Sequence, residues 1–248
     1  MQLSGNTVLV TGGSNGIGLA LAERFLAKGN RVLICGRREE KLKEAQLRHP
    51  ELVTRVCDLT QAEERVSLVA WLEATFPDLN ILINNAGIQN RVNILTSERS
   101  WEDLQQEIGT NLEAPLHLSF LLAKRLAQKT PASIINVSSG LAFVSMAAAP
   151  IYCATKAALH SFSISMRVQL ASVGIDVVEV APPMVQTDLC APGIHAAGTP
   201  VDAFADAVML GLAEGKQEIG YGYSLPLLSM SREELDNATI QLNARVPH

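Results

Sequence analysis

Short apolar runs rich in valine, isoleucine and leucine recur along the chain, and most are followed by a stretch in which apolar positions are spaced as on a helix. The runs are too short for helices and carry many β-branched residues, so they predict buried strands. The expected strands lie at about 7–11, 31–36, 53–57, 81–83, 134–138, 175–181 and 218–223. Apolar strands that alternate with helices indicate a parallel sheet covered on both faces.

Helices are expected between these strands, at about 19–28, 39–48, 61–76, 101–128, 150–173 and 201–213, with a terminal helix from residue 231 onward. Ser231 and Glu234 have the spacing of a capping box at the start of that last helix. Pro115 lies inside the 101–128 helix and predicts a kink, because proline has no backbone N–H. Without repeats or a linker, residues 1–248 are expected to form a single α/β domain.

A glycine-rich turn follows the first strand and leads into the first helix. Gly12, Gly16 and Gly18 form the spacing Gly-x-x-x-Gly-x-Gly. Glycines allow a backbone to approach a pyrophosphate closely, and the free N–H groups at a helix start attract its negative charge. Ordinary turns also need glycine, but the strand before this turn and the amphipathic helix after it favour dinucleotide binding.

Two arginines, Arg37 and Arg38, stand at the end of the second strand, about twenty residues after the glycine turn. An acidic residue at this strand end would bind the ribose 2′-hydroxyl of NAD, and the strand end has none. An arginine fork suits the 2′-phosphate of NADP, so NADP(H) is favoured over NAD(H). The alternative is that both arginines only cap a solvated loop before the 39–48 helix.

Two further strand ends carry polar or small residues. Asp58 follows the third strand, where three roles stay open: it caps the next helix, bonds an adenine amino group, or does both. Asn84, Asn85, Ala86 and Gly87 follow the fourth strand. This turn-prone cluster is typical of a loop whose backbone lies against a ligand.

The candidate chemistry lies between residues 134 and 159, where Ser139 ends a strand and a helix follows. Tyr152 and Lys156 are four residues apart and share one face of that helix. A phenol serves as a general acid or base only if its pKa, ordinarily about 10, moves toward neutral, and a nearby ammonium favours the phenolate. With a hydroxyl to hold the substrate oxygen, these groups suit carbonyl reduction or alcohol oxidation. The alternative is an ordinary surface pair of Tyr152 and Lys156.

Composition and charge exclude several other classes of protein. Apolar residues make up 48% of the chain and charged residues 18%, which excludes a disordered chain. The net charge of −5 comes without a dense basic patch, so no nucleic-acid partner is expected. No apolar run reaches the ~18 residues of a membrane span, and the N-terminus lacks a signal-peptide pattern. The scattered cysteines are expected to be reduced thiols in a cytoplasmic protein, and the dispersed histidines predict no metal site.

Taken in order, these motifs resemble the short-chain dehydrogenases/reductases in their compact single-domain branch, from Thr11 to about Thr187. The resemblance implies a Rossmann-type, doubly wound, mostly parallel seven-stranded sheet with helices on both faces. The catalytic set that it implies is Asn111, Ser139, Tyr152 and Lys156. The dinucleotide contacts that it implies are Gly12, Ser14, Asn15, Gly16, Ile17, Gly18, Arg37, Arg38, Asp58, Leu59, Asn85, Ala86, Gly87, Tyr152, Lys156, Pro182, Val185 and Thr187.

The same resemblance assigns a role to each catalytic side chain. Tyr152 is the acid/base, Ser139 orients the carbonyl, and Lys156 lowers the tyrosine pKa and holds the nicotinamide ribose. Asn111 holds a water in a proton relay to Lys156, and Thr187 fixes the carboxamide. The resemblance also implies a homodimer or homotetramer built on the 101–128 and 152–173 helices.

The substrate side is expected to be apolar, which favours an apolar or mixed small carbonyl compound. The candidate lining residues are Leu141, Phe143, Met146, Met184 and Leu189. The alternative is that several of them pack in the core or at a subunit contact. The glycine- and proline-containing segment at about 188–200 is expected to be a mobile substrate loop. One departure from the family pattern, Pro183 where Pro-Gly is usual, predicts a differently shaped nicotinamide wall.

Three other hypotheses for the function remain open beside the carbonyl reductase. A catalytically silent sensor or scaffold would bind the dinucleotide without turnover, and the intact catalytic set counts against it. A dehydrogenase that prefers NAD would keep the same chemistry. An enzyme of this fold with different chemistry, such as a sugar epimerase or an enoyl reductase, ranks lowest.

Overall fold

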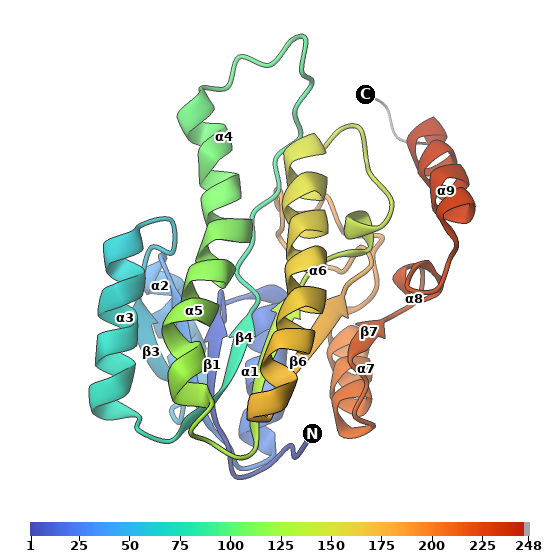
Figure 1. The fold of residues 1–248 in the computed structure, drawn as a ribbon. Helices are drawn as coiled ribbons and strands as arrows, with labels where there is room; N and C mark the ends of the chain where they lie inside the picture. Colours follow the sequence, from blue (N-terminus) through green and yellow to red (C-terminus); the bar gives the residue numbers. More distant parts are fainter. Residues whose placement is uncertain (246–248) are drawn as a thin grey trace.

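Seven strands form one parallel sheet in the computed structural model, which describes residues 1–245 (Figure 1). Their order across the sheet is β3-β2-β1-β4-β5-β6-β7, and each neighbouring pair is parallel. The strands are β1 (Thr7–Thr11), β2 (Arg31–Gly36), β3 (Val53–Val56), β4 (Leu79–Asn84), β5 (Ala132–Val137), β6 (Ile175–Ala181) and β7 (Glu218–Gly220). The predicted seven-stranded, doubly wound sheet is therefore confirmed.

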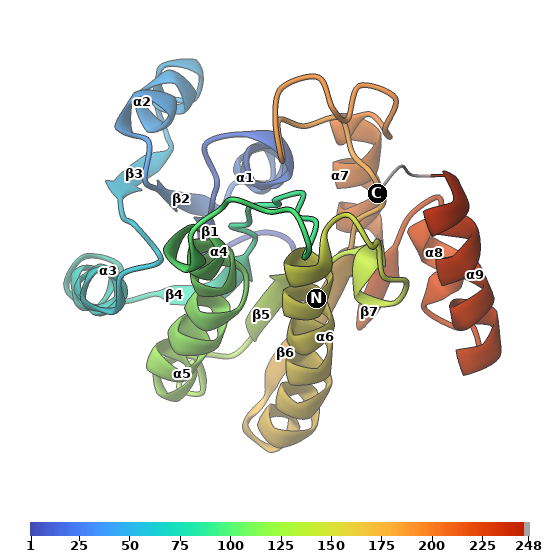
Figure 2. The same cartoon turned by 90° about the horizontal axis from the view of Figure 1, so that it is seen from above.

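Helices cover both faces of the sheet, as the view along it shows (Figure 2). One face carries α1 (Gly16–Ala27), α2 (Glu39–Arg48) and α7 (Val201–Ala213). The other face carries α3 (Ala62–Thr75), α5 (Ala114–Leu126) and α6 (Pro150–Leu170). Three further helices lie outside these layers: α4 (Trp101–Ile108), α8 (Ser224–Leu227) and α9 (Arg232–Arg245). None of the helices in residues 1–245 combines the length and the apolar character needed to cross a bilayer.

The strands are apolar throughout because each contributes to two cores. Side chains alternate across a strand, so Val8 and Val10 face the core under α1 and α7, whereas Leu9 faces the core under α3 and α5. All three side chains are completely buried. Burying a side chain of this size contributes about 1.5–3 kcal/mol, so the double-sided burial accounts for the lack of polar alternation in the sequence.

The direction of the chain across the sheet reverses between β1 and β4. The first three strands step outward to one edge, and the next four step outward to the other. Helices that leave β1 and β4 consequently lie on opposite faces, which opens a crevice at the carboxyl ends of these two strands. The loops that carry the predicted functional residues begin at this edge of the sheet.

Most predicted element bounds agree with the structure within a few residues, and the exceptions have local causes. α1 begins at Gly16, so Gly16 and Gly18 lie in its first turn and not in the preceding loop. The strand expected at 218–223 ends at Gly220, and the short helix α8, which was not predicted, follows it. The capping box of α9 is present: Ser231 N–H donates to Glu234 Oε2 at 2.7 Å.

The long helix expected at 101–128 is interrupted before Pro115. A π-helical turn, Gly109–Glu113, separates α4 from α5. Proline crowds the carbonyl four residues earlier, which here belongs to Asn111, and it offers no N–H to that carbonyl. The backbone therefore widens by one residue at the position of Asn111, in the way π-turns often mark functional sites.

Candidate active site

Ser139 and Tyr152 meet at the carboxyl edge of the sheet, where β5 ends and α6 begins. Both side chains are buried, and the Ser139 hydroxyl lies close enough to the Tyr152 phenol to act on its pKa. Ser139 Oγ also accepts the backbone N–H of Leu141 at 3.1 Å, which fixes the serine rotamer at the start of a short 3₁₀ turn. Ser139 and Tyr152 therefore converge as predicted. The loop between β5 and α6 connects them along the chain.

Lys156 lies one turn of α6 beyond Tyr152 and is also buried. Its Nζ donates to the carbonyl of Val137 at 2.9 Å and lies 5.6 Å from the centroid of the Tyr152 ring. Because both side chains are buried against the end of β5, the alternative of an ordinary surface pair is wrong. Their shared face points at the crevice edge of the sheet.

Asn111 is completely buried in the π-helical turn and holds the loop after β4. Its Oδ1 accepts the N–H of Ile88 at 2.9 Å, and its Nδ2 donates to the Ile88 carbonyl at 2.8 Å. A Cβ atom placed on Gly87 would lie 3.4 Å from Asn111 Oδ1 and 3.7 Å from Lys156 Nζ. Asn111 and Lys156 therefore face the same glycine, and the predicted catalytic set gathers in one place.

The electrostatics of the site differ from the simplest expectation. Burial raises the pKa of the Tyr152 phenol, and the hydrogen bond from Ser139 only partly opposes this. Burial lowers the pKa of Lys156 to about 8, against the attraction of Glu179 and Glu107. The net lowering of the tyrosine pKa that was expected from Lys156 is therefore not found, because burial raises this pKa.

The glycine turn between β1 and α1 is packed closely against the loop after β4. Gly12 has a φ of +62°, and a Cβ there would approach the Ala86 Cα to 2.9 Å. A Cβ on Gly18 would meet the Asn85 Nδ2 at 2.4 Å, and this amide donates to the carbonyl of Thr11 at 2.9 Å. The first N–H groups of α1, at Ile17 and Gly18, have no partner within the helix and stand at this edge. This cradle fits a dinucleotide pyrophosphate.

The end of β2 presents both arginines to solvent. Arg37 and Arg38 are exposed, and within residues 1–245 neither side chain takes part in a hydrogen bond or an ion pair. Arg38 occupies the position before α2 without a side-chain cap, which counts against the capping alternative. Ser14 Oγ lies beside this strand end, because a Cβ on Gly36 would be 3.7 Å from it.

Asp58 does not cap α3. Its Oδ1 accepts from the backbone N–H of Thr60 at 3.0 Å and from the Thr60 hydroxyl at 2.9 Å, and Gln61 stands at the helix cap. A carboxylate three residues before a cap reaches only the intervening turn, so the capping role considered for Asp58 is wrong. The adjacent Leu59 is buried. The adenine contact of both residues stays a prediction.

The loop after β6 lies against the glycine turn. Pro182 accepts the Gly140 N–H at 2.8 Å, and Val185 is buried. Thr187 Cγ2 would be 3.1 Å from a Cβ on Gly16, and Asn15 Nδ2 donates to Asp188 Oδ2 at 3.2 Å. The loops expected to hold the pyrophosphate and the nicotinamide carboxamide are thus in direct contact.

The predicted substrate residues are distributed around this edge. Leu141, Phe143, Met146 and Leu189 are partly buried, whereas half of the Met184 surface is exposed. The Phe143 ring packs edge-on against His160 at 4.6 Å. The 188–200 segment is closed at its base by hydrogen bonds between the backbones of Met184, Gln186 and Thr199. Its mobility, and the role of the five lining residues, stay predictions.

Sequence reasoning did not find a buried polar cluster beneath α6. Glu179 of β6 is completely buried; it accepts from Ser138 Oγ at 2.5 Å and pairs with His160 Nδ1 at 2.7 Å. The hydrogen bond with Glu179 raises the pKa of His160. A glutamate within an otherwise apolar strand was the available signal, because buried carboxylates need partners.

A second unpredicted carboxyl group, that of Glu107, acts electrostatically on Tyr152. Glu107 of α4 is completely buried, and its Oε2 accepts from Asn90 Nδ2 at 2.9 Å. Burial raises the pKa of Glu107, while hydrogen bonds from Asn90 oppose this. Nothing in the local pattern around Glu107 marks it, since its burial depends on the loop after β4.

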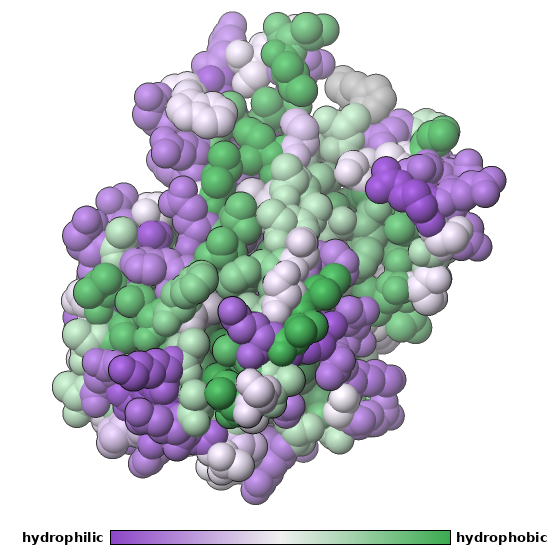
Figure 3. All heavy atoms as spheres, viewed as in Figure 1, coloured by the Kyte–Doolittle hydropathy of each residue, from purple (hydrophilic) through white to green (hydrophobic). Residues whose placement is uncertain are grey.

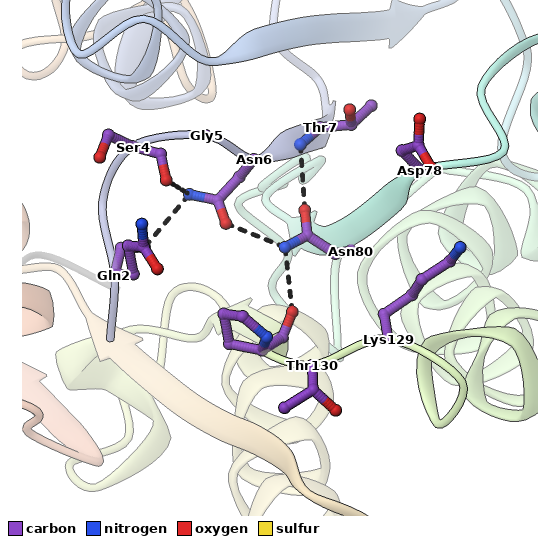
Figure 4. Close-up of a pocket in the computed structure, with 10 residues that line it drawn as sticks. Gln2, Ser4, Gly5, Asn6, Thr7, Asp78, Asn80, Lys129 and Thr130 are labelled. Carbon is purple, nitrogen blue, oxygen red and sulfur yellow. Dashed lines mark hydrogen bonds between the residues drawn. The ribbon is translucent and has the colours of Figure 1, made fainter.

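A polar pocket of about 200 Å³ lies at the opposite edge of the sheet, at the amino ends of β1 and β4 (Figure 4). Asn80 Nδ2 donates to Asn6 Oδ1 at 2.9 Å and to the Pro131 carbonyl at 3.0 Å, and its Oδ1 accepts from Thr7 N–H at 3.0 Å. These groups satisfy one another. These hydrogen bonds connect the starts of the strands, and the pocket lies far from Ser139 and Tyr152.

Comparison with known proteins agrees with this arrangement. A model of the short chain dehydrogenase family matches residues 6–195. The uncharacterized oxidoreductase DltE of Bacillus subtilis is 42% identical over 253 residues, which cover 99% of each chain. The chain belongs to the short-chain dehydrogenase family. It is therefore a member of an oxidoreductase family, and the predicted resemblance is confirmed.

Two further proteins illustrate what this chain is similar to. The 3-oxoacyl-[acyl-carrier-protein] reductase FabG of Rickettsia bellii is 36% identical over 190 residues, which cover 76% of each chain. A short-chain dehydrogenase from Burkholderia cenocepacia, solved in complex with NADP, has a TM-score of 0.84 and 26% identity, with 97% of this chain and 99% of that one covered. Family membership and the glycine cradle together support binding of a nicotinamide dinucleotide.

Proposed function

We propose that this protein is an NADP(H)-dependent oxidoreductase that interconverts a carbonyl and an alcohol, with Tyr152 as general acid/base. The observation that carries the proposal is that the buried hydroxyl groups of Tyr152 and Ser139 lie together, at the sheet edge that also holds the glycine cradle. A bound nicotinamide dinucleotide supplies or accepts the hydride. The protein's own residues then need only to hold the carbonyl and to move one proton.

The geometry supports a role for each side chain. Ser139 and Tyr152 present two hydroxyl groups to one oxygen atom, which aligns a carbonyl for protonation by the Tyr152 phenol. Lys156, fixed on the Val137 carbonyl, places a positive charge behind the tyrosine ring. Asn111 faces Gly87 together with Lys156, which supports a water-mediated link between Asn111 and the lysine.

The preference for NADP(H) over NAD(H) rests on Arg37 and Arg38. Both guanidinium groups are exposed at the end of β2 and are not engaged elsewhere within the described residues. A 2′-phosphate between them would form charge-assisted hydrogen bonds, which a 2′-hydroxyl cannot match. NADP in the related Burkholderia structure is consistent with this preference.

Fluorescence titration with NADPH and, separately, NADH tests the proposal. We expect tighter binding of NADPH, and we expect Arg37→Ala to weaken NADPH binding by about 10–100-fold while NADH binding changes little. Arg48→Ala, at the far end of α2, is the matched control and changes neither affinity. Preference for NADH would contradict the arginine argument and leave Tyr152 as the acid/base. Tight binding without turnover of any carbonyl compound would favour the silent sensor.

For the substrate, we propose an apolar or mixed small carbonyl compound. The side chains around the edge beyond Ser139 and Tyr152 are apolar, with half of Met184 exposed on the loop after β6. A panel of aliphatic and aromatic ketones and aldehydes, followed by NADPH oxidation, tests this class. Turnover restricted to strongly charged carbonyl compounds would contradict it.

We further propose a homodimer or homotetramer built on α4, α5 and α6. The face formed by α5 and α6 is largely apolar (Figure 3), and Phe120, Ile164 and Val168 are exposed on it. Exposed apolar residues clustered on two adjacent helices are typical of a protein interface. A cytoplasmic location is consistent with four cysteines that are all unpaired.

A further inference from the structure

The last helix, α9, lies beside the loop that connects Ser139 to α6 (Figures 1 and 2). It has no fully buried residue. Its partly buried positions recur every three or four residues, which places them on the side of α9 that faces the molecule; they are Leu235, Ala238, Thr239, Leu242 and Asn243. α9 also lies beyond residue 195, where the match to the family model ends. Its contacts are therefore features of this chain beyond the matched family core.

The side chain of Asn243 joins α9 to that loop through two hydrogen bonds and makes a third within α9. Its Oδ1 accepts the backbone N–H of Ala147 at 2.7 Å, and its Nδ2 donates to the carbonyl of Ser145 at 2.8 Å. The second Nδ2 proton is used within α9, on the Thr239 carbonyl at 2.8 Å. A primary amide is the side chain that can donate and accept in this way, so the position is chemically specific.

The loop between these contacts is held from two other sides. The Met146 N–H lies 3.2 Å from Cys153 Sγ on α6, and the Ala148 carbonyl accepts the Val92 N–H at 2.9 Å. Met146, one of the predicted substrate residues, thus stands between the two backbone groups that Asn243 binds. The same loop leads through Pro150 into the turn of α6 that carries Tyr152.

We propose that Asn243 is a positioning residue: by holding the backbone of residues 145–147 it places Met146 at the substrate side of Tyr152, which makes α9 part of the wall that selects the substrate. The effect of Asn243 on substrate binding rests on the proposed function, whereas its role in fixing the backbone of residues 145–147 does not. Without Asn243, two backbone groups of the loop lose their partners and Met146 can move away from the tyrosine.

Hydrogen–deuterium exchange tests the hold on the loop in the free, full-length protein. In Asn243→Ala we expect the peptide covering residues 144–149 to exchange about tenfold faster than in the wild type. Asn243→Asp keeps the acceptor for the Ala147 N–H and loses the donor, so its exchange rate lies between the two. Asn237→Ala, an exposed asparagine on the same helix, is the matched control and leaves the loop unchanged. Unchanged exchange in Asn243→Ala would overturn the proposal.

Steady-state kinetics test the effect on substrate, using the ketone or aldehyde of the panel that the wild type reduces best. We expect Asn243→Ala to raise KM for that compound about tenfold, with kcat and NADPH affinity within about twofold of the wild type. Asn243→Asp gives a smaller rise. Faster exchange with an unchanged KM would overturn the positioning role. A wild type that reduces no carbonyl compound would overturn the proposed function instead, and the exchange experiment alone would then decide the hold on the loop.

Discussion

At the scale of single residues, the Tyr152 hydroxyl has a function that can be separated from binding. Tyr152→Phe removes the proton that is transferred and leaves the buried ring in place, so we expect turnover to fall by about 10²–10⁴-fold. The NADPH dissociation constant should stay within about twofold, since the ring still fills its site. Stopped-flow reduction and fluorescence titration of the same preparation measure the two quantities.

Tyr223→Phe is the matched control for that substitution, because Tyr223 is half exposed and lies outside the proposed catalytic set. It should leave both quantities unchanged. Turnover by Tyr152→Phe at the wild-type rate would show that another group protonates the product, and the assignment of the acid would then pass to a different side chain.

We expect the reaction rate to depend on pH through Lys156, whose pKa is set mainly by burial. Because burial lowers the pKa of Lys156 to about 8, the lysine carries its charge below this pH and loses it as the pH rises through about 8. Tyr152 stays protonated over the same range, since burial raises its pKa. If carbonyl reduction needs the ammonium, kcat/KM falls as the pH rises through about 8. A profile from pH 6 to 10 measures this.

A guanidinium stays charged throughout that range, so Lys156→Arg is the informative variant. Where it retains activity, the fall near pH 8 should disappear. A fall with the same midpoint in the arginine variant would assign the titration to a group other than Lys156.

At the scale of elements, the pair of His160 and Glu179 joins α6 to β6 beneath the site. The raised pKa of His160 means that its charged form is favoured in the folded state. This stabilisation is fully present below the ordinary histidine pKa of about 6.5 and is lost as the pH rises through the higher folded value. His160→Gln should therefore lower the free energy of unfolding by about 1–3 kcal/mol at pH 6 and by less at pH 9. Urea unfolding at both pH values measures the difference.

The charged groups that face His160 come from three elements: Glu179 on β6, Glu218 on β7 and Arg167 on α6. His49→Gln is the comparison, because His49 pairs with Glu23 at 2.9 Å near the surface and its loss should cost about 0–1 kcal/mol. Equal destabilisation by His160→Gln at pH 6 and pH 9 would contradict the charged pair.

Elements defined by a local pattern could be predicted, whereas those defined by tertiary contacts could not. The helix at 201–213 and the strand at 175–181 were predicted with their observed bounds, because apolar spacing and β-branched runs are local signals. α8 is a single turn held by Ser224, whose hydroxyl donates to the Ala181 carbonyl at 2.5 Å, and no local pattern encodes that contact. The π-turn at Asn111 was anticipated only as a kink at Pro115.

The same distinction holds inside the site. The spacing of Ser139, Tyr152 and Lys156 predicted that they converge, because strand end and helix face are properties of the local chain. The direction of the Tyr152 pKa shift could not be predicted, since it follows from burial by distant segments. The roles of Asn243 and Glu107 could not be predicted for the same reason. Asn243 binds a loop far away in the sequence, and Glu107 binds Asn90 in a loop that has no regular apolar pattern.

At the scale of the whole molecule, the apolar face of α5 and α6 predicts how copies of the chain associate. Phe120 and Val168 are 72% and 78% exposed, so they would be among the best-covered side chains if this face is the interface. Changing both to charged residues, Phe120→Lys with Val168→Lys, places like charges on the two sides of any symmetric contact. We expect this variant to elute as a monomer of 26.6 kDa, whereas the wild type elutes at twice or four times that mass.

Light scattering coupled to size-exclusion chromatography measures the mass, and circular dichroism checks that the variant is folded. Leu210→Lys is the matched control, because Leu210 is 61% exposed on α7, on the opposite face of the sheet. It should keep the wild-type mass. That result would exclude a general increase in positive charge as the cause of dissociation. If the α7 variant dissociates and the α5–α6 variant does not, the interface lies on the other face. In that case α6 would be solvent-exposed behind Tyr152, and subunit contacts could not contribute to holding its catalytic turn.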